Sequence, residues 1–289
     1  MSTPALRIGE LSKRSGVSPE LLRAWERRYG LLQPSRSTGG LRLYSVDDLE
    51  RVRRMRQHLA DGVAAAEAAA LVSRPTRPGE AAAPAAAAAR ELAEALDAFD
   101  EPRAQAALDT LLAAATVDAL LTEAVLPYLR DLGERWQRGD ASIAQEHFSS
   151  SILRGRLLGL ARGWGRGLGP LALLACVPHE RHDLGLIAFG LALHARGWRI
   201  AYLGADTPLE TIDGAARSLA PAVVVLGAAT EDRVDAIAGE LRDLAKLHRL
   251  ALGGSGVTGG TATELGALAL ARDPVAAAEQ LTAHLGAGR

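Results

Sequence analysis

The stretch that decides the fold reads VPHERHDLG, residues 177–185. An apolar run typical of a buried strand precedes it, and a second apolar run, typical of a helix, follows it. In a parallel sheet such a loop lies at the carboxyl edge, where open α/β sheets bind their ligands. The loop contains His182, with Glu180 and Asp183 as neighbouring carboxylates. A carboxylate that fixes the tautomer of a neutral imidazole prepares the imidazole to bind a transition metal. Since one histidine cannot hold a bare ion, we expect any metal to arrive inside a large organic cofactor.

Short apolar runs and helical segments alternate from here to the end of the chain. The runs predict four buried strands and a fifth candidate, at residues 171–177, 198–203, 222–226, 250–252 and 268–270. Strands that alternate with helices indicate a doubly wound parallel sheet. No G-x-G-x-x-G follows the first strand, which argues against a nicotinamide-binding sheet. We therefore predict a Rossmann-like domain over residues 168–289.

The chain before this domain has helical periodicity. Residues 85–167 carry apolar stripes with short connections between them, and they predict a four-helix bundle. The preceding residues 73–84 are rich in proline and predict a linker. The chain is therefore expected to be a multidomain α and α/β protein.

Residues 1–72 predict a winged helix-turn-helix. Ser18 is a good N-cap for a helix with Pro19 in its first turn, and Gly30 ends that helix. A shorter helix precedes it across a glycine turn, as in a helix-turn-helix. The pair Gly39-Gly40 between extended stretches then predicts a hairpin, or wing.

The charge distribution points to a nucleic-acid partner for this unit alone. Residues 1–74 contain 13 Lys/Arg against 8 Asp/Glu, whereas the rest of the chain contains 20 against 26. Arg23 and Arg27 share a face of the second helix and can meet phosphates or guanine edges, while Arg36 and Arg42 on the wing can clamp the DNA backbone. A solvated basic face is the ordinary alternative, but the order of helices, turn and wing is far more specific.

Cysteine content and hydropathy bear on the cellular compartment. Cys176 is the only cysteine, so one chain can form neither a disulfide framework nor a thiolate cluster, which suits a reducing compartment. The first residues form no apolar signal region, and no window approaches the ~18 apolar residues of a membrane span. We expect a soluble, cytoplasmic protein.

Two further groups of residues have chemical potential. Trp136 ends one bundle helix, and Glu146 and His147 follow it across a helix junction after nine intervening residues. Gly227-Ala228 and Gly253-Gly254 follow the third and fourth strands, where small residues would open a slot for a long ligand. Taken singly, a capping Trp, a surface ion pair and ordinary turns would explain them.

Together these motifs resemble known families. Residues 7–72 resemble the winged helix-turn-helix of the MerR family of transcription regulators, most clearly over Trp25 to Gly30 and the wing Gly-Gly-x-Arg-Leu-Tyr, so Tyr29 and Tyr44 join the expected DNA-binding residues. Glu180-x-His182-x-x-Gly185 with the later glycines resembles the B12-binding domain. Trp136 with Glu146-His147 resembles the helical cap of light-sensing, cobalamin-dependent MerR-type repressors of the CarH/LitR kind.

The resemblance implies a role for each residue toward adenosylcobalamin. His182 would displace the dimethylbenzimidazole of the cofactor and become the lower cobalt ligand, with Glu180 or Asp183 hydrogen-bonded to its imidazole and Arg181 and Gly185 in the same motif. A channel for the displaced tail would be lined by Gly227, Ala228, Gly253 and Gly254. The upper face, where the adenosyl group sits, would be covered by Trp136, Gln137, Glu146 and His147.

Three positions depart from the family pattern. Glu180 stands where aspartate is usual, and Gly227 stands where serine is usual, which removes a hydroxyl worth on the order of 1 kcal/mol. Gln137 stands where these photoreceptors commonly have a histidine able to ligate cobalt after light has expelled the adenosyl group. Capture of cobalt by two histidines is therefore unavailable at that position, and His147 is the nearest substitute.

The leading hypothesis is a light-responsive transcriptional repressor and not an enzyme. It would bind operator DNA as a dark-state homo-oligomer, a dimer or tetramer, and be released when light cleaves the cobalt–carbon bond of adenosylcobalamin. A cobalamin sensor that ignores light is the second hypothesis, because of Gln137. A corrinoid carrier in methyl transfer or part of a mutase, and a metal- or drug-sensing regulator without B12, rank lower.

Overall fold

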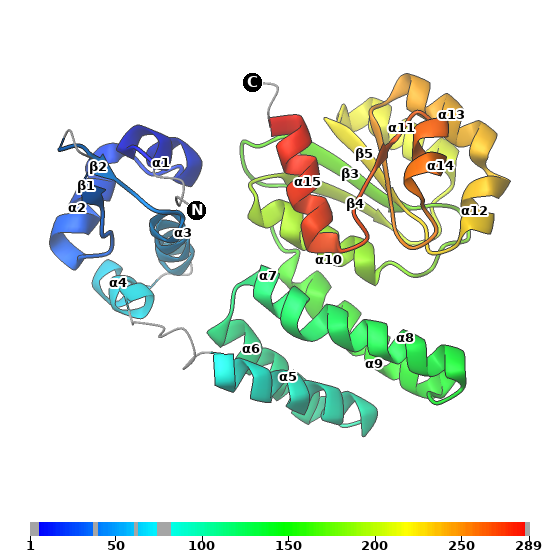
Figure 1. Ribbon diagram of the computed structural model, residues 1–289, viewed down its shortest axis with the longest axis horizontal. Coiled ribbons are helices and arrows are strands. Elements are labelled where there is room, and N and C mark those ends of the chain that lie inside the picture. The colour runs from blue at the N-terminus through cyan, green and yellow to red at the C-terminus, as the bar shows by residue number, and fades with distance from the viewer. Residues whose placement is uncertain (1–5, 37–39, 61–62, 74–81, 287–289) are drawn as a thin grey trace. The chain divides into compact units, whose positions relative to one another are not determined.

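A computed structural model describes residues 6–36, 40–60, 63–73 and 82–286. The chain forms two compact units, Met1–Glu80 and Ala81–Arg289, and each is described by itself. The second unit contains both the helical bundle and the sheet (Figure 1).

The first unit is a winged helix-turn-helix, as predicted. Its elements are α1 (Ile8–Ser15), α2 (Pro19–Tyr29), β1 (Ser35–Arg36), β2 (Arg42–Leu43), α3 (Val46–Ala60) and α4 (Ala65–Ser73). Gly16 and Gly30 end α1 and α2 with φ of 67° and 63°, a left-handed conformation that glycine adopts without strain. Ser18 Oγ accepts a hydrogen bond from the Leu21 N–H at the start of α2. The wing is the antiparallel pair β1–β2; Gly39 lies outside the described residues.

The second unit begins with the predicted bundle. Its elements are α5 (Ala82–Asp97), α6 (Glu101–Ala114), α7 (Val117–Leu120), the π-helical turn η1 (Leu121–Val125), α8 (Leu126–Arg138) and α9 (Ile143–Leu160). Because α7, η1 and α8 follow without a break, these elements make four helices. The wide turn η1 precedes Pro127, which has no N–H and whose ring crowds the carbonyl of Glu123 four residues earlier. The predicted linker, residues 73–84, is corrected at both ends: Ser73 is the last residue of α4, and Ala82, Ala83 and Pro84 lie in the first turn of α5, where proline is tolerated.

All five predicted strands are present and form one parallel sheet. They are β3 (Leu171–Cys176), β4 (Arg199–Gly204), β5 (Val223–Gly227), β6 (Leu250–Gly253) and β7 (Leu268–Ala269), in the order β4-β3-β5-β6-β7. Between and after them come α10 (Leu184–Ala195), α11 (Leu209–Leu219), α12 (Glu231–Ala236), α13 (Ala238–Leu247), α14 (Gly259–Glu264) and α15 (Pro274–Gly286). The strand order reverses between β3 and β5, which makes their carboxyl ends the topological switch point of the sheet.

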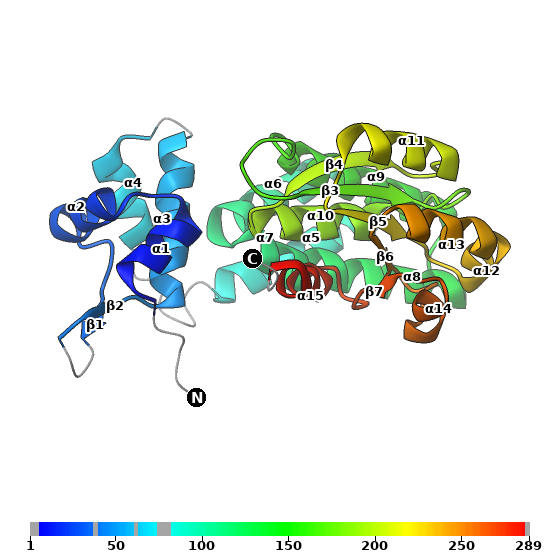
Figure 2. The ribbon, with the colours of Figure 1, turned by 90° about the horizontal axis from the view of Figure 1, so that it is seen from above.

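The sheet is covered on both faces, so it is doubly wound. Leu174 and Cys176 of β3 belong to a core shared with α10, α15 and the bundle, whereas Leu173 and Ala175 belong to a core shared with α11, α13 and α14. Figure 2 shows β3 and β4 between α11 on one side and α10 on the other. Because successive residues of a strand point to opposite faces, burial on both sides requires the continuous apolar runs in the sequence.

Within the described ranges, no helix is both long enough and apolar enough to cross a membrane.

Candidate functional site

The loop between β3 and α10 presents His182 at the switch point of the sheet. The His182 side chain is 71% exposed, and its Nδ1 lies 2.7 Å from Glu180 Oε1, whose own side chain is fully buried. An ionised carboxylate can only accept hydrogen bonds, so in the neutral imidazole Nδ1 carries the proton and Nε2 has a free lone pair. The imidazole is therefore prepared as a metal ligand through Nε2.

The carboxylate of Glu180 is held by four donors. Oε1 accepts from the backbone N–H and Nδ1 of His182, at 2.9 and 2.7 Å. Oε2 accepts from the Ala229 N–H at 2.7 Å and from Arg233 Nη1. Burial alone would raise the pKa of Glu180, but the hydrogen bonds from His182, Ala229 and Arg233 outweigh it and lower the pKa below its ordinary value. Glu180 is thus a charged group in a dry position.

Glu180 also joins the loops that follow three strands. The Asp206 N–H, after β4, donates to the Glu180 carbonyl at 2.7 Å, and Asp206 Oδ1 accepts from the His179 N–H at 2.6 Å. Ala229 lies in the loop after β5, so its bond to the Glu180 side chain crosses the switch point. The loop that carries His182 is therefore fixed on both sides. Arg181, in the same loop, is exposed.

Asp183 has a different role from the one left open by the sequence. Its carboxylate is 4% exposed and accepts from Arg154 Nη2 of α9 at 2.8 Å and from the Tyr202 hydroxyl of β4 at 2.7 Å. Burial, and the hydrogen bond to Asp183, raise the pKa of Tyr202. Glu180 is thus the partner of the imidazole, while Asp183 ties the bundle to the sheet one residue after His182.

The glycines at the strand ends differ in what they require. Gly227 and Gly253 are paired in the register of β5 and β6, and a Cβ on Gly227 would meet Cys176 Sγ at an ordinary 3.7 Å. Gly254 has φ of 107°, and a Cβ there would lie 2.1 Å from the Ala228 carbonyl oxygen. Gly254 is therefore required by the close approach of two loops of the chain itself. Gly185 lies in the first turn of α10, and a Cβ there would have no neighbour within 4 Å.

Exposed apolar and polar groups gather at the α8–α9 junction. Trp136 in the last turn of α8 is 54% exposed, and Ile143 at the start of α9 is exposed as well. Glu146 accepts from the Ser150 hydroxyl at 2.7 Å, and the exposed His147 lies beside it with Nε2 3.6 Å from the carboxylate. Ile143 is not among the residues predicted from the sequence, because an apolar residue at the start of a helix is ordinarily assigned to the core.

This junction and the His182 loop lie at the same end of the second unit. Figures 1 and 2 both show the α8–α9 turn at the end where α12, the helix after β5, is found. Gln137, next to Trp136, is exposed. Among the described residues, no group of three or more His, Cys, Asp and Glu side chains could hold a bare metal ion.

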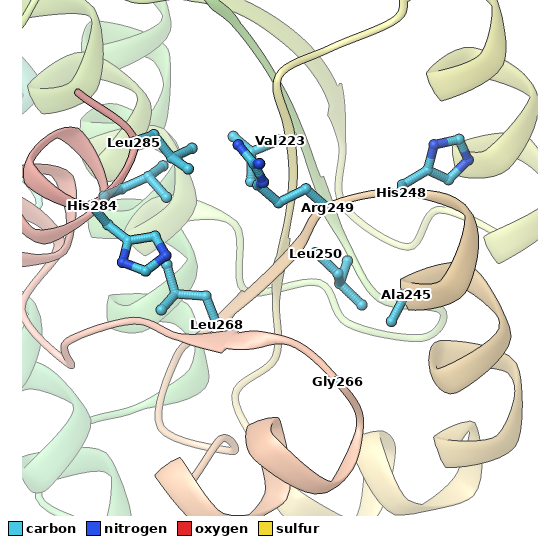
Figure 3. A pocket seen from close by; sticks show the side chains of 10 residues that line it. Val223, Ala245, His248, Arg249, Leu250, Gly266, Leu268, His284 and Leu285 are labelled. Atoms are coloured by element: carbon cyan, nitrogen blue, oxygen red, sulfur yellow. The ribbon is translucent and has the colours of Figure 1, made fainter. Parts of the chain in front are cut away.

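A separate cavity of about 280 Å³ lies at the opposite, amino-terminal edge of the sheet (Figure 3). It is lined mostly by apolar side chains, with Arg249 beside Val223 and with His248, which is bonded through Nε2 to Asp213 Oδ1 at 2.8 Å. Ligands of open α/β sheets bind at the other edge, the carboxyl edge, so this cavity is not in the position expected of the principal site.

In the first unit, Arg23 and Arg27 are exposed on α2 as expected of DNA-contacting residues. Arg42 of the wing is about half exposed, with Nε 3.1 Å from Glu26 Oε1. The prediction that Tyr44 contacts DNA is wrong: its side chain is 1% exposed, and its hydroxyl donates to Glu26 at 2.9 Å. Burial, and then the bond to Glu26, raise the pKa of Tyr44 to about 12.

Two other predicted DNA-binding residues stay predictions. Tyr29 is half-buried at the end of α2, with the Arg28 guanidinium 5.8 Å from its ring centre. The Arg36 side chain lies outside the described residues.

Comparisons with known proteins agree with this architecture. Residues 6–74 match the MerR HTH family regulatory protein, and residues 88–158, which run from within α5 to near the end of α9, match the B12 binding domain. The fold of the second unit is similar to that of the monomethylamine corrinoid protein of Methanosarcina barkeri, with a TM-score of 0.56 at 18% identity, over 67% of this chain and 96% of that chain.

Two curated relatives cover most of the chain. The HTH-type transcriptional repressor CarH of Myxococcus xanthus is 35% identical over 237 residues, 78% of this chain and 79% of that protein. The HTH-type transcriptional repressor CarA of the same organism is 34% identical over 76% of this chain and 75% of that protein. The protein therefore belongs to the family of MerR-type transcriptional repressors with a B12-binding domain that includes CarH and CarA.

Proposed function

We propose that this protein is an adenosylcobalamin-binding, light-responsive transcriptional repressor. The observation that carries the proposal is the exposed His182 imidazole, whose Nδ1 is tied to a buried carboxylate so that Nε2 is left to bind a metal. A single such ligand suits a cobalt ion that already has an equatorial ring of nitrogen ligands, and it suits no bare ion.

The residues present fit this cofactor on both of its faces. His182 would ligate cobalt from below, and the glycine-rich ends of β5 and β6 would border the path of the nucleotide tail. Trp136 and Ile143 would cover the upper face with apolar surface, and Glu146 and His147 would offer hydrogen bonds to a polar upper group. When bound, adenosylcobalamin supplies a cobalt–carbon bond that light cleaves.

The response to light would pass through the position of the bundle. A bundle that contacts the upper group has a different preferred position once that group has left, which is a population shift driven by differential contacts. Arg154 and Asp183 connect the bundle directly to the His182 loop. In the dark we expect an oligomer, a dimer or tetramer, that places several winged units on one operator and so multiplies their affinity for DNA. Loss of the upper group would weaken the oligomer and release DNA.

A cobalamin sensor that ignores light is the second candidate, and Gln137 favours it. An amide side chain at this exposed position offers no imidazole to trap a photoproduct. A corrinoid carrier is disfavoured because a winged helix-turn-helix has no use in methyl transfer, although the carrier shares the fold of the second unit.

The deciding experiment loads the full chain with adenosylcobalamin in darkness. A duplex selected by the protein from a random DNA pool serves as the operator probe, and the absorption spectrum, sedimentation mass and DNA affinity are recorded before and after green light. We expect a lower mass and a weaker DNA complex after illumination. Unchanged mass and affinity, despite a spectrum that shows photolysis, would refute light gating and favour the second candidate. His182→Ala serves as the control variant that lacks the proposed cobalt ligand.

A further inference from the structure

Arg233 contacts the metal-binding loop from a distant part of the sequence. It lies on α12, after the loop at the carboxyl end of β5, and its Nη1 donates to Glu180 Oε2. The Arg233 side chain is 30% exposed, whereas Glu180 is fully buried. Among the described residues, Arg233 is the one side chain from outside the 177–185 loop that donates a hydrogen bond to this carboxylate, and the other outside donor is the Ala229 N–H.

The two oxygens of the Glu180 carboxylate accept hydrogen bonds from different parts of the chain. Oε1 receives both donors from His182, and Oε2 receives the Ala229 N–H and the Arg233 guanidinium. The guanidinium and the imidazole are thus held on opposite oxygens of one rigid carboxylate. A buried carboxylate needs charged or multiple hydrogen-bond partners. A partner on Oε2 limits rotation of the whole carboxylate, and it therefore also fixes Oε1, the oxygen that orients the imidazole.

We propose that Arg233 is a positioning residue that acts through Glu180 to fix the orientation and donor strength of the His182 imidazole toward cobalt. This inference rests on the proposed function, because it assumes a metal at Nε2. Groups that orient a metal ligand through a hydrogen bond commonly change metal affinity by about 10–100-fold when they are removed. We place Arg233 in this class although it never touches the metal.

A purely structural role for Arg233 makes a different prediction. A contact that only anchors α12 to the β3 loop would, when removed, change the unfolding temperature of the protein and leave the bond between His182 and cobalt unchanged. If Arg233 positions the imidazole, its removal should change the spectrum of the bound corrinoid, because His182 is then held less firmly. The two roles are separated by measuring both quantities on the same variant.

The test compares Arg233→Met with the wild type in the full chain, with adenosylcobalamin as the probe. We expect affinity for adenosylcobalamin to fall by about tenfold or more, with a smaller fraction in the His-ligated form by absorption spectroscopy. Arg233→Lys, which keeps a charged donor, should recover part of both. Arg217→Met is the matched control, since it removes a surface arginine paired with Asp213 in the same domain and should change neither.

A double-mutant cycle tests whether Arg233 acts through Glu180. In a Glu180→Gln background, Arg233→Met should change the affinity by less than twofold, because the carboxylate that relays its effect is gone. Equal effects of Arg233→Met in the two backgrounds would overturn the proposal. So would unchanged affinity and spectrum in Arg233→Met alone; Arg233→Gln takes its place if the Met variant does not fold.

Failure of the underlying function has its own signature. If the wild type does not bind adenosylcobalamin, or gives the same spectrum as His182→Ala, the cobalt site itself is wrong and this inference falls with it. If the wild type binds through His182 and Arg233→Met behaves identically, only the role of Arg233 is overturned.

Discussion

Replacing Arg154 by methionine tests the connection between the bundle and the sheet. Arg154 on α9 donates through Nε and Nη2 to the carboxylate of Asp183, which is 4% exposed and has the Tyr202 hydroxyl as its other side-chain donor. Methionine keeps the length of the aliphatic stem but removes the guanidinium. Asp183 would then be buried with a single neutral side-chain partner.

The expected cost follows from the burial of the two partners. Hydrogen bonds to charged groups contribute about 1.5–3 kcal/mol each, and an unpaired buried charge costs still more. Arg154 itself is 47% exposed, so water already screens it and can replace part of the interaction. We therefore expect a loss of about 1.5 kcal/mol in the free energy of unfolding. For a unit of this size that corresponds to a fall of about 3–6 °C in Tm.

The assay follows unfolding of the apo protein by the fluorescence of Trp164 and Trp198, which are buried in the second unit. Adding Asp183→Asn to Arg154→Met should cost less than the sum of the single changes, because the stranded charge is removed. Arg217→Met, a change in an exposed pair on α11, should cost less than 0.5 kcal/mol or so. A Tm of Arg154→Met within about 1 °C of the wild type would refute the reasoning.

Three further predictions concern charge, DNA and backbone. The pKa of Glu180 is lowered from its ordinary 4.5, so the ionised carboxylate stabilises the fold above that pH. The stability advantage of the wild type over Glu180→Gln should therefore shrink as the pH falls and the carboxylate is protonated. An advantage that is independent of pH in urea titrations would contradict this. Arg27→Ala should weaken DNA binding and lower the slope of log affinity against log salt by about one, as filter binding at several salt concentrations can show; an unchanged slope excludes a phosphate contact. Gly254→Ala should cost about 2 kcal/mol or more, given its φ of 107° and the 2.1 Å approach to a carbonyl, whereas Gly253→Ala, with neighbours at 3.5 Å, should cost less than half of that; equal melting temperatures would contradict the contrast.

The sequence by itself determined the elements of this protein. Every predicted strand appears in the sheet, the winged helix-turn-helix has its predicted order, and the loop after β3 carries His182 at the carboxyl edge. These features follow from local patterns: apolar runs, helical spacing, and glycine or serine at helix ends. Such patterns act over a few residues, so the order of residues is enough to predict them.

Only the tertiary structure decided which side chains meet. Asp183 is adjacent to His182 in the sequence and Glu180 is two residues away, yet Glu180 holds the imidazole and Asp183 holds Arg154 of a different helix. Arg233 contacts Glu180 although the two are 53 residues apart in the sequence, and no local sequence pattern predicts that contact. The physical reason is that the hydrogen-bond partners of a buried charge depend on how strand ends and helices converge in space. The order of residues in the sequence does not give the distances between such distant segments.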